Sequence, residues 1–118
     1  MEMDDALLSL AALAQGTRLE VFRLLAAHKP DGLAAGEIAR RLAVPHNTLS
    51  SHLAILTRAG LIGAERRSRT IIYRASLQRF GALASYLLKD CCGGRPEVCA
   101  PLVEALTPCC SSPETEHA

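Results

Sequence analysis

The sequence predicts a small, mainly α-helical domain made of five helices and one β-hairpin. The chain has 118 residues, which is the size of a single domain. Hydrophobic residues make up 49% of it, but only two Phe, two Tyr and no Trp are present. The core must therefore be built from aliphatic side chains and alanine, which suits packed helices. Apolar residues also recur at helical spacing over most of the chain, and the period changes only after residue 60.

Two helices are expected first. Asp4-Asp5 can open the first helix, and Gln15-Gly16 interrupts it. Thr17 is expected to cap the second helix, because Glu20 follows three residues later in the arrangement of a capping box. The segment Lys29-Pro30-Asp31-Gly32 contains the residues of a tight turn and should end this helix.

A pair of helices joined by a short turn comes next. Residues 35–43 are expected to form a short helix, which Val44-Pro45 breaks. A further helix is expected from about Asn47 to Arg58, and Gly60 lies just past its end, where a glycine C-cap is favoured. This spacing predicts a helix-turn-helix.

The remaining elements are a hairpin and a long last helix. Leu61–Arg66 and Thr70–Arg74 are β-leaning segments around a basic tip, Arg67-Ser68-Arg69. Ser76 can cap the last helix, and Gly93-Gly94 terminates it. The apolar stripe of this helix is wide for so small a domain and contains Leu77, Phe80, Leu83, Ala84, Leu87 and Leu88. The order of elements is that of a winged helix-turn-helix, with the hairpin as the wing.

The charges are distributed unevenly along the chain. Residues 40–80 hold eight arginines and one glutamate, a net charge of +7, whereas the segments on either side each carry −3. A basic middle between acidic ends is typical of a polyanion-binding face, and the alternative is a solvated surface without a partner. No apolar run approaches the ~20 residues that cross a bilayer, and the acidic N-terminus is unlike a signal peptide. We therefore expect a cytoplasmic protein that is neither a membrane protein nor an enzyme.

Two segments resemble a known family. The pattern S-x-H-L-x-x-L-x-x-A-G-L is complete from Ser50 to Leu61, inside the longer segment Glu37–Ile62, and a second matching segment is Ala14–Leu25. Both resemble the ArsR/SmtB family of bacterial metal-responsive repressors, and the resemblance covers roughly residues 4–90. It implies a homodimer paired through its first and last helices. It also implies operator DNA as the partner, with no small organic substrate.

The candidate DNA-contacting residues lie in the expected recognition helix and in the wing. Such a helix needs small polar side chains near its N-terminal end, where it meets base edges and phosphates. Asn can bond adenine through two hydrogen bonds, Ser and Thr can bond a base or a phosphate, and arginines suit the DNA backbone or minor groove. The candidates are His46, Asn47, Thr48, Ser50 and Ser51 in the helix and Arg66, Arg67 and Arg69 in the wing.

Simpler interpretations of some of these residues stay open. His46 would otherwise be the N-cap of its helix, and Ser50 and Ser51 would otherwise be plain helix surface. We expect His52 to be a buried structural histidine bonded to the backbone.

All five cysteines follow residue 90, at Cys91, Cys92, Cys99, Cys109 and Cys110. Two sensing motifs of the family are absent, because residues 33–38 lack a Cys-x-Cys and residues 76–90 lack a histidine. Other members place metalloid-binding cysteines after the last helix, and Cys91-Cys92 with Cys99 is similar to that arrangement. The resemblance is therefore to the arsenite- and antimonite-responsive members.

The chemistry of the thiols favours a trivalent metalloid. As(III) and Sb(III) prefer three thiolates in a pyramid, whereas zinc and cadmium usually take four tetrahedral ligands. Cys99 can join either Cys91-Cys92 or Cys109-Cys110, and we favour the second pair because it lies outside the long helix. We thus predict a DNA-binding and dimerisation domain at residues 1–92 and a metalloid-binding tail at 93–118. The alternatives are another soft metal (cadmium, zinc or lead) or a thiol-redox switch.

Overall fold

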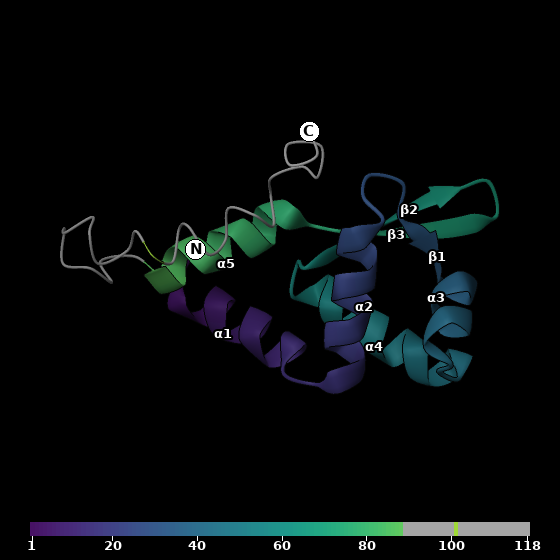
Figure 1. The fold of residues 1–118 in the computed structure, drawn as a ribbon, viewed down its shortest axis with the longest axis horizontal. Helices are drawn as coiled ribbons and strands as arrows, with labels where there is room; N and C mark the ends of the chain where they lie inside the picture. Colours follow the sequence, from purple (N-terminus) through teal and green to yellow (C-terminus); the bar gives the residue numbers. More distant parts are fainter. Residues whose placement is uncertain (89–100, 102–118) are drawn as a thin grey trace. The chain divides into compact units, whose positions relative to one another are not determined.

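The computed structural model describes residues 1–88 and Pro101, and residues Met1–Tyr86 form one compact unit. It has the five helices and the hairpin of a winged helix-turn-helix, as the sequence predicts (Figure 1). The elements in chain order are α1 (Met3–Leu13), α2 (Gly16–Ala27), β1 (Leu33–Ala34), α3 (Ala35–Leu42), α4 (His46–Arg58), β2 (Ile62–Arg67), β3 (Thr70–Ala75) and α5 (Leu77–Leu88). Within the described residues, no helix is long and apolar enough to cross a membrane.

The sheet has three antiparallel strands in the order β1-β3-β2. The predicted hairpin is confirmed, and its register pairs Ile62 with Ala75 at the base and Arg67 with Thr70 at the outer end. Arg67 is therefore the last residue of β2, and the tip consists of Ser68 and Arg69 alone. Ser68 adopts a left-handed conformation, with φ of 56°, which closes this two-residue turn.

The strand β1 has no counterpart in the sequence-based expectation. It is two residues long, which is too short to show any periodicity, and Leu33 pairs with Tyr73 of β3. Gly32 makes this pairing possible. Its φ is +76°, and a Cβ added there would lie 2.4 Å from the carbonyl oxygen of Tyr73. Only glycine lets the loop approach β3 so closely.

One expected helix cap, Thr17, is wrong, and so is the alternative interpretation of His46 as a cap. The helix α2 begins at Gly16, and its N-cap is Gln15, whose side-chain oxygen accepts from the backbone N–H of Arg18 at 2.8 Å. Thr17 therefore lies inside the first turn instead of capping it. The N-cap of α4 is Pro45, so His46 is the first helical residue and not a cap.

Two other predicted helix ends are confirmed. Gly60 follows α4 with φ of +79°, and the hydroxyl of Ser76 accepts from the backbone N–H of Arg79 at 3.1 Å. The core between the helices and the base of the sheet is aliphatic, as expected. Its most deeply buried large side chains are Val21, Leu25, Ile38, Leu49, Leu56 and Leu61.

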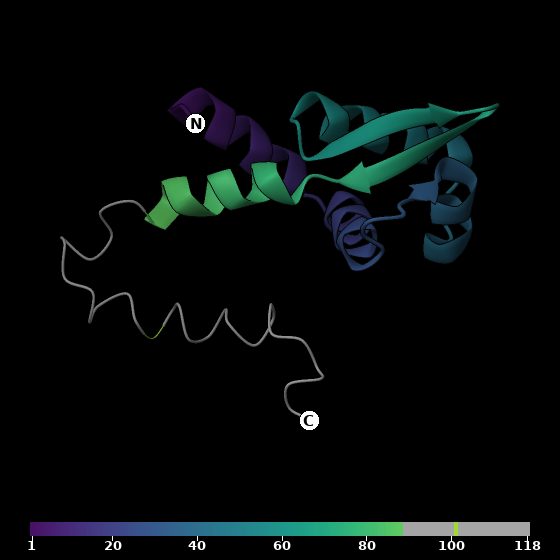
Figure 2. The same ribbon diagram turned by 90° about the horizontal axis from the view of Figure 1, so that it is seen from above.

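The helices α1 and α5 leave large apolar side chains exposed. Of the predicted apolar stripe on α5, Leu83 is buried, but Leu77 and Phe80 remain 47% and 42% exposed. On α1, Leu7 is 56% exposed and Leu8 is 45% exposed. Both views place α1 and the first turns of α5 at the end of the compact unit that is remote from the hairpin tip (Figures 1 and 2).

Candidate nucleic-acid interface

The helix α4 has one buried face and one exposed face. Leu49, Leu53 and Leu56 are buried and hold the helix on the core. Their spacing of three and four residues turns the other residues of the helix outward. We define the outer face of α4 as the exposed residues Asn47, Ser50, Ser51, Ala54 and Arg58. A helix with this short, polar outer face can approach another surface closely.

Two polar side chains on the outer face already make local hydrogen bonds. The hydroxyl of Ser50 donates to the carbonyl oxygen of His46 at 3.1 Å. The Oδ1 atom of Asn47 accepts from the backbone N–H of Thr48 at 2.9 Å. Each bond uses one hydrogen-bonding function of the side chain and leaves the others free. The adjacent Thr48 is also exposed, and its backbone N–H is committed to Asn47.

The two histidines of α4 have different surroundings. His46 is exposed, and its Nε2 lies 3.9 Å from where a Cβ on Gly36 would be, so its imidazole turns back towards α3. His52 is partly buried, and its Nδ1 lies 3.3 Å from a terminal guanidinium nitrogen of Arg18. The expected backbone partner of His52 is therefore wrong, because its partner within residues 1–88 is a side chain. Since a guanidinium only donates, Nδ1 is the acceptor in this bond.

The three predicted wing arginines are all exposed, but they are not equivalent. The side chains of a strand alternate between its two faces, so Arg66 shares a face with Ala64 and Tyr73. Arg67 lies on the opposite face, where its Nε is 3.9 Å from the carboxylate of Glu65. Neither Arg66 nor Arg69 has an acidic partner within residues 1–88. These two arginines therefore keep their full charge for a ligand.

Other arginines of the basic segment are held inside the protein's own ion pairs. Arg74 bonds to Glu65, which lowers the pKa of that carboxyl, and Nε of Arg74 donates to the carbonyl oxygen of Pro30 at 2.8 Å. This contact fastens the wing to the loop that follows α2. Arg40 and Arg41 both bond to Glu37 on α3. The charge available to a ligand is consequently smaller than the net +7 of residues 40–80, and it is concentrated on the wing and on Arg58.

A groove of about 420 Å³ separates the outer face of α4 from the sheet. Its lining residues are Ala35, Ser50, Leu53, Ala54, Thr57, Arg58, Ala64 and Tyr73. Arg58 and Tyr73 were not predicted from the sequence as binding residues. Arg58 was detectable, since it lies seven residues after Ser51 and so falls on the same helical face. Tyr73 was not, because only the sheet brings it next to α4.

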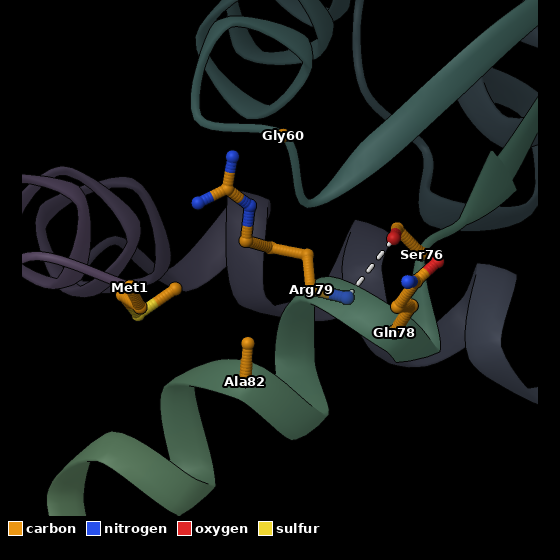
Figure 3. Close-up of a pocket in the computed structure, with 6 residues that line it drawn as sticks. All are labelled: Met1, Gly60, Ser76, Gln78, Arg79 and Ala82. Atoms are coloured by element: carbon orange, nitrogen blue, oxygen red, sulfur yellow. Dashed lines mark hydrogen bonds between the residues drawn. The ribbon is translucent and has the colours of Figure 1, made fainter.

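A second hollow lies where α4 ends and α5 begins (Figure 3). The guanidinium of Arg79 projects towards Gly60, and a Cβ added to Gly60 would lie 2.7 Å from its Nε. A cation in this position is favourable next to the negative end of the α4 dipole. Arg79 therefore has a structural explanation, and the hollow adds no group to the DNA-facing set.

The predicted metalloid ligands cannot be placed. Among residues 1–88 and Pro101, no three His, Cys, Asp or Glu side chains gather in a way that could hold a metal ion. The predicted boundary between residues 92 and 93 lies outside the described residues. So do all five cysteines, which are Cys91, Cys92, Cys99, Cys109 and Cys110.

Comparison with known proteins agrees with this architecture. Residues 13–62 match a family described as a helix-turn-helix domain. The chain is 31% identical over 87 residues to the transcriptional activator HlyU of Vibrio cholerae, covering 74% of this chain and 78% of HlyU. A solved structure of reduced HlyU has a TM-score of 0.58 at 30% identity and covers 72% of this chain and 85% of that one.

Two further solved structures are similar over most of their length. An ArsR-like transcriptional regulator from Rhodococcus sp. RHA1 has a TM-score of 0.69 at 26% identity, covering 88% of this chain and 92% of that one. A homodimeric winged helix-turn-helix DNA-binding domain from Mycobacterium bovis, described as a possible ArsR-family regulator, has a TM-score of 0.61 at 28% identity, with coverages of 75% and 82%. The fold, the helix-turn-helix and these similarities together show that the chain belongs to the ArsR/HlyU family of winged helix-turn-helix transcriptional regulators.

Proposed function

We propose that this regulator is a homodimeric repressor that leaves its operator DNA when As(III) or Sb(III) binds three of its C-terminal cysteines. The observation that supports the DNA-binding half is the outer face of α4. It exposes short polar side chains on a helix-turn-helix, beside a wing whose Arg66 and Arg69 have no acidic partner within residues 1–88. Such a helix fits a major groove, and such arginines fit the phosphates beside it.

The exposed apolar side chains of α1 and α5 support the homodimer. Leu7, Leu8, Leu77 and Phe80 are each more than 40% exposed, and they come from two helices at the same end of the compact unit. Exposed apolar side chains gathered on two such helices are typical of a protein–protein interface. The similar domain from Mycobacterium bovis is itself described as homodimeric. Two recognition helices in one dimer would contact two half-sites of an operator with two-fold symmetry.

Salt dependence tests the DNA-binding half of the proposal. The logarithm of the affinity for operator DNA should fall linearly with the logarithm of salt concentration, with a slope of about −0.9 per phosphate contact. Arg66→Ala and Arg69→Ala should each make this slope shallower by about one contact. Arg67→Ala is the matched control and should change it less, because Arg67 shares the carboxylate of Glu65. An affinity that does not change with salt would contradict DNA binding through this face.

The effector half of the proposal is supported by the distribution of soft ligands. All five thiols follow residue 90, and the described residues offer no competing cluster of metal ligands. A thiol-redox switch is the second candidate, because the similar protein HlyU has been solved in a form described as reduced. Low-pKa thiols oxidise to disulfides, so the same cysteines would serve either kind of signal.

A mobility-shift assay on operator DNA separates these effectors. Arsenite and antimonite should release the protein under reducing conditions, whereas zinc, cadmium, lead and peroxide should not. A hundredfold loss of DNA affinity corresponds to about 2.7 kcal/mol of coupling, and DNA should weaken metalloid binding by the same factor. Release by peroxide alone would establish the redox switch instead. Since HlyU is named an activator, transcription from the operator in vitro must also be measured.

Cysteine variants then test the ligand set. Cys99→Ser should abolish the response and leave DNA binding intact, and so should joint replacement of Cys109 and Cys110 by Ser. If the latter variant still responds and the Cys91→Ser, Cys92→Ser variant does not, the earlier pair is the site. If both double variants respond, the tail-cysteine proposal is wrong in either form. Because thiolates are the binding form, metalloid binding should also release protons.

A further inference from the structure

We infer that Ser50 is a specificity-determining residue that accepts a hydrogen bond from the exocyclic amino group of an adenine or a cytosine. This inference rests on the proposed binding of α4 in the major groove. The new element is that Ser50 acts as the acceptor of one hydrogen bond, so that a base with an exocyclic amino group is expected at one position of the operator.

The direction follows from the partner of Ser50 inside the protein. Its hydroxyl oxygen lies 3.1 Å from the carbonyl oxygen of His46, one helical turn earlier. A carbonyl oxygen carries no proton, so the hydroxyl of Ser50 must be the donor in this bond. The single hydroxyl proton is thereby used. What the exposed side chain offers to a ligand is the lone pairs of its oxygen, which only accept.

The major groove contains few donors that could meet such an acceptor. Adenine presents its N6 amino group and cytosine its N4 amino group, whereas guanine presents N7 and O6 and thymine presents O4, all of which are acceptors. An acceptor on the protein that faces a guanine or a thymine keto oxygen would leave two desolvated acceptors in contact, which is unfavourable. Ser50 in its observed conformation therefore selects the strand that carries the amino base.

The neighbouring residue Asn47 also offers a donor. Its Oδ1 accepts from the backbone N–H of Thr48 at 2.9 Å, and the Nδ2 amino group remains wholly free as a donor. Reading adenine through two hydrogen bonds requires Oδ1 to accept from N6 as well, which its second lone pair allows. The contact of Asn47 with adenine therefore stays a prediction. A base acceptor or a phosphate oxygen is a further possible partner for its amino group.

The surroundings of Ser50 permit a close approach of a base edge. Ser50 lines the groove between α4 and the sheet, and the lining also includes the small side chains of Ala54 and Ala64. Asn47 and Ser50 are three residues apart and share the outer face of α4, so both can face the same groove.

The first stage of the test locates the contact. Operator sequences are selected in vitro from randomised duplexes with the full-length protein and with Ser50→Ala. The variant should lose its preference at one base pair and keep the others. Because Ser50 is exposed, Ser50→Ala should fold normally, which its thermal unfolding checks. If the full-length wild type selects no sequence and its affinity ignores salt, the proposed function fails before this inference is reached.

The second stage determines the direction of the bond. At the base pair identified, one duplex carries a base without its exocyclic amino group, and another carries a 7-deazapurine, which lacks the N7 acceptor. Loss of the amino group should weaken wild-type binding about three- to tenfold, the size of one hydrogen bond, and the 7-deaza duplex should bind normally. Ser50→Ala should bind all the duplexes equally. Ser50→Thr, which keeps the hydroxyl and its bond to the preceding turn, should discriminate like the wild type.

Ser85→Ala supplies the matched control, since Ser85 is an exposed serine on α5, outside the DNA-facing residues, and this variant should retain the wild-type discrimination. The inference is overturned if the 7-deaza duplex binds weakly while the amino-deficient duplex binds normally, because Ser50 would then be a donor. It is also overturned if Ser50→Ala selects the same sequences as the wild type, while specific DNA binding itself would still stand.

Discussion

Arg18 joins three helices through one side chain. Its Nε donates to the carbonyl oxygen of Ala12 at 2.6 Å, and a terminal nitrogen donates to the carbonyl oxygen of Ala11 at 3.4 Å. Arg18 lies on α2, and it thereby supplies hydrogen-bond donors to carbonyl groups at the C-terminal end of α1. Its other terminal nitrogen bonds to His52 on α4, the helix that carries the outer face. Charged donors to partly buried carbonyls contribute more than neutral ones. Arg18 thus positions α4 relative to α1.

We expect Arg18→Ala to lower the free energy of unfolding by about 2 kcal/mol, because the carbonyl of Ala12 and the Nδ1 of His52 lose their donor, and the carbonyl of Ala11 keeps only that of Ala14. Urea unfolding at a fixed protein concentration measures this change, since association would otherwise shift the midpoint. The control is Arg23→Ala, an exposed arginine on the same helix, which should stay within about 0.5 kcal/mol of the wild type. Equal stability of the two variants would show that the Arg18 contacts contribute nothing.

Glu37 carries a shifted pKa because two arginines bind it. Hydrogen bonds first from Arg40 and then from Arg41 lower the pKa of Glu37 from its ordinary value of 4.5 to about 2. The folded state therefore favours the carboxylate, so its contribution to stability is present above about pH 4.5 and is lost as the pH falls towards 2. Carbon NMR of the Glu37 carboxyl should give the lowered pKa directly.

Replacement of Arg40 by Ala should raise the pKa of Glu37 towards 4.5, since the hydrogen bond that lowers this pKa most is removed. The Glu37→Gln variant should show a smaller decrease of the unfolding midpoint between pH 4.5 and pH 2 than the wild type does. Both ion pairs are at the surface, so added salt should reduce the difference. A Glu37 pKa that is the same in the wild type and in Arg40→Ala would disprove this assignment.

At the scale of elements, the short strand β1 depends on one glycine. Gly32→Ala should lower the free energy of unfolding by about 1–3 kcal/mol, because alanine is strained at positive φ and its Cβ would overlap the Tyr73 carbonyl. Hydrogen exchange should also become faster at β1 and at the neighbouring part of β3. The control is Gly16→Ala at the start of α2, where an added Cβ meets nothing within 4 Å. It should be neutral or slightly stabilising.

The wing is the element whose function depends most on its neighbours. The alternation of side chains along β2 places Arg66 and Arg67 on opposite faces, and Glu65 and Arg74 then accompany only Arg67. Of the three arginines between residues 66 and 69, Arg66 and Arg69 are thus available to a ligand, whereas the charge of Arg67 is partly neutralised by Glu65. The bond from Arg74 to Pro30 also couples the orientation of the wing to the loop before β1.

For the whole molecule, the exposed apolar side chains of α1 and α5 predict the oligomeric state. Leu7→Glu and Leu77→Glu should each convert a dimer into a monomer, because a buried unpaired carboxylate opposes association. Sedimentation equilibrium would show the halved mass. Ile71→Glu on the wing is the matched control, since Ile71 is also exposed, at 38%, but lies on the hairpin remote from these helices. If all three variants remain dimeric, the interface lies elsewhere.

The same variants connect dimerisation to operator binding. A monomer contacts one half-site only, so Leu7→Glu should bind the full operator much more weakly than the wild type does. A single half-site should be bound equally weakly by both proteins at low concentration. Equal affinities of the monomeric variant and the wild type for the full operator would mean that one protomer suffices.

The sequence by itself determined the types of the five helices and the hairpin, their order and the buried face of α4. These features depend on local signals, such as the glycine after α4, the serine before α5 and the leucines spaced along α4, which act wherever the chain lies. The predicted Thr17 cap is wrong for a local reason too, because the side chain of Gln15 already accepts from the backbone N–H of Arg18 at this helix end. The family resemblance added the DNA-binding role, which the comparisons with known regulators support.

Only the tertiary structure decided which of these residues are free to act. The strand β1 exists because β3 lies beside it, and Tyr73 and Arg58 share a groove because the sheet packs next to α4. Whether an arginine keeps its charge for a ligand depends on where Glu37 and Glu65 lie, and residue counts contain no such information. The hydrogen-bond direction of Ser50 is likewise a property of position. A serine can donate or accept in any sequence, and here the His46 carbonyl at 3.1 Å takes its only proton.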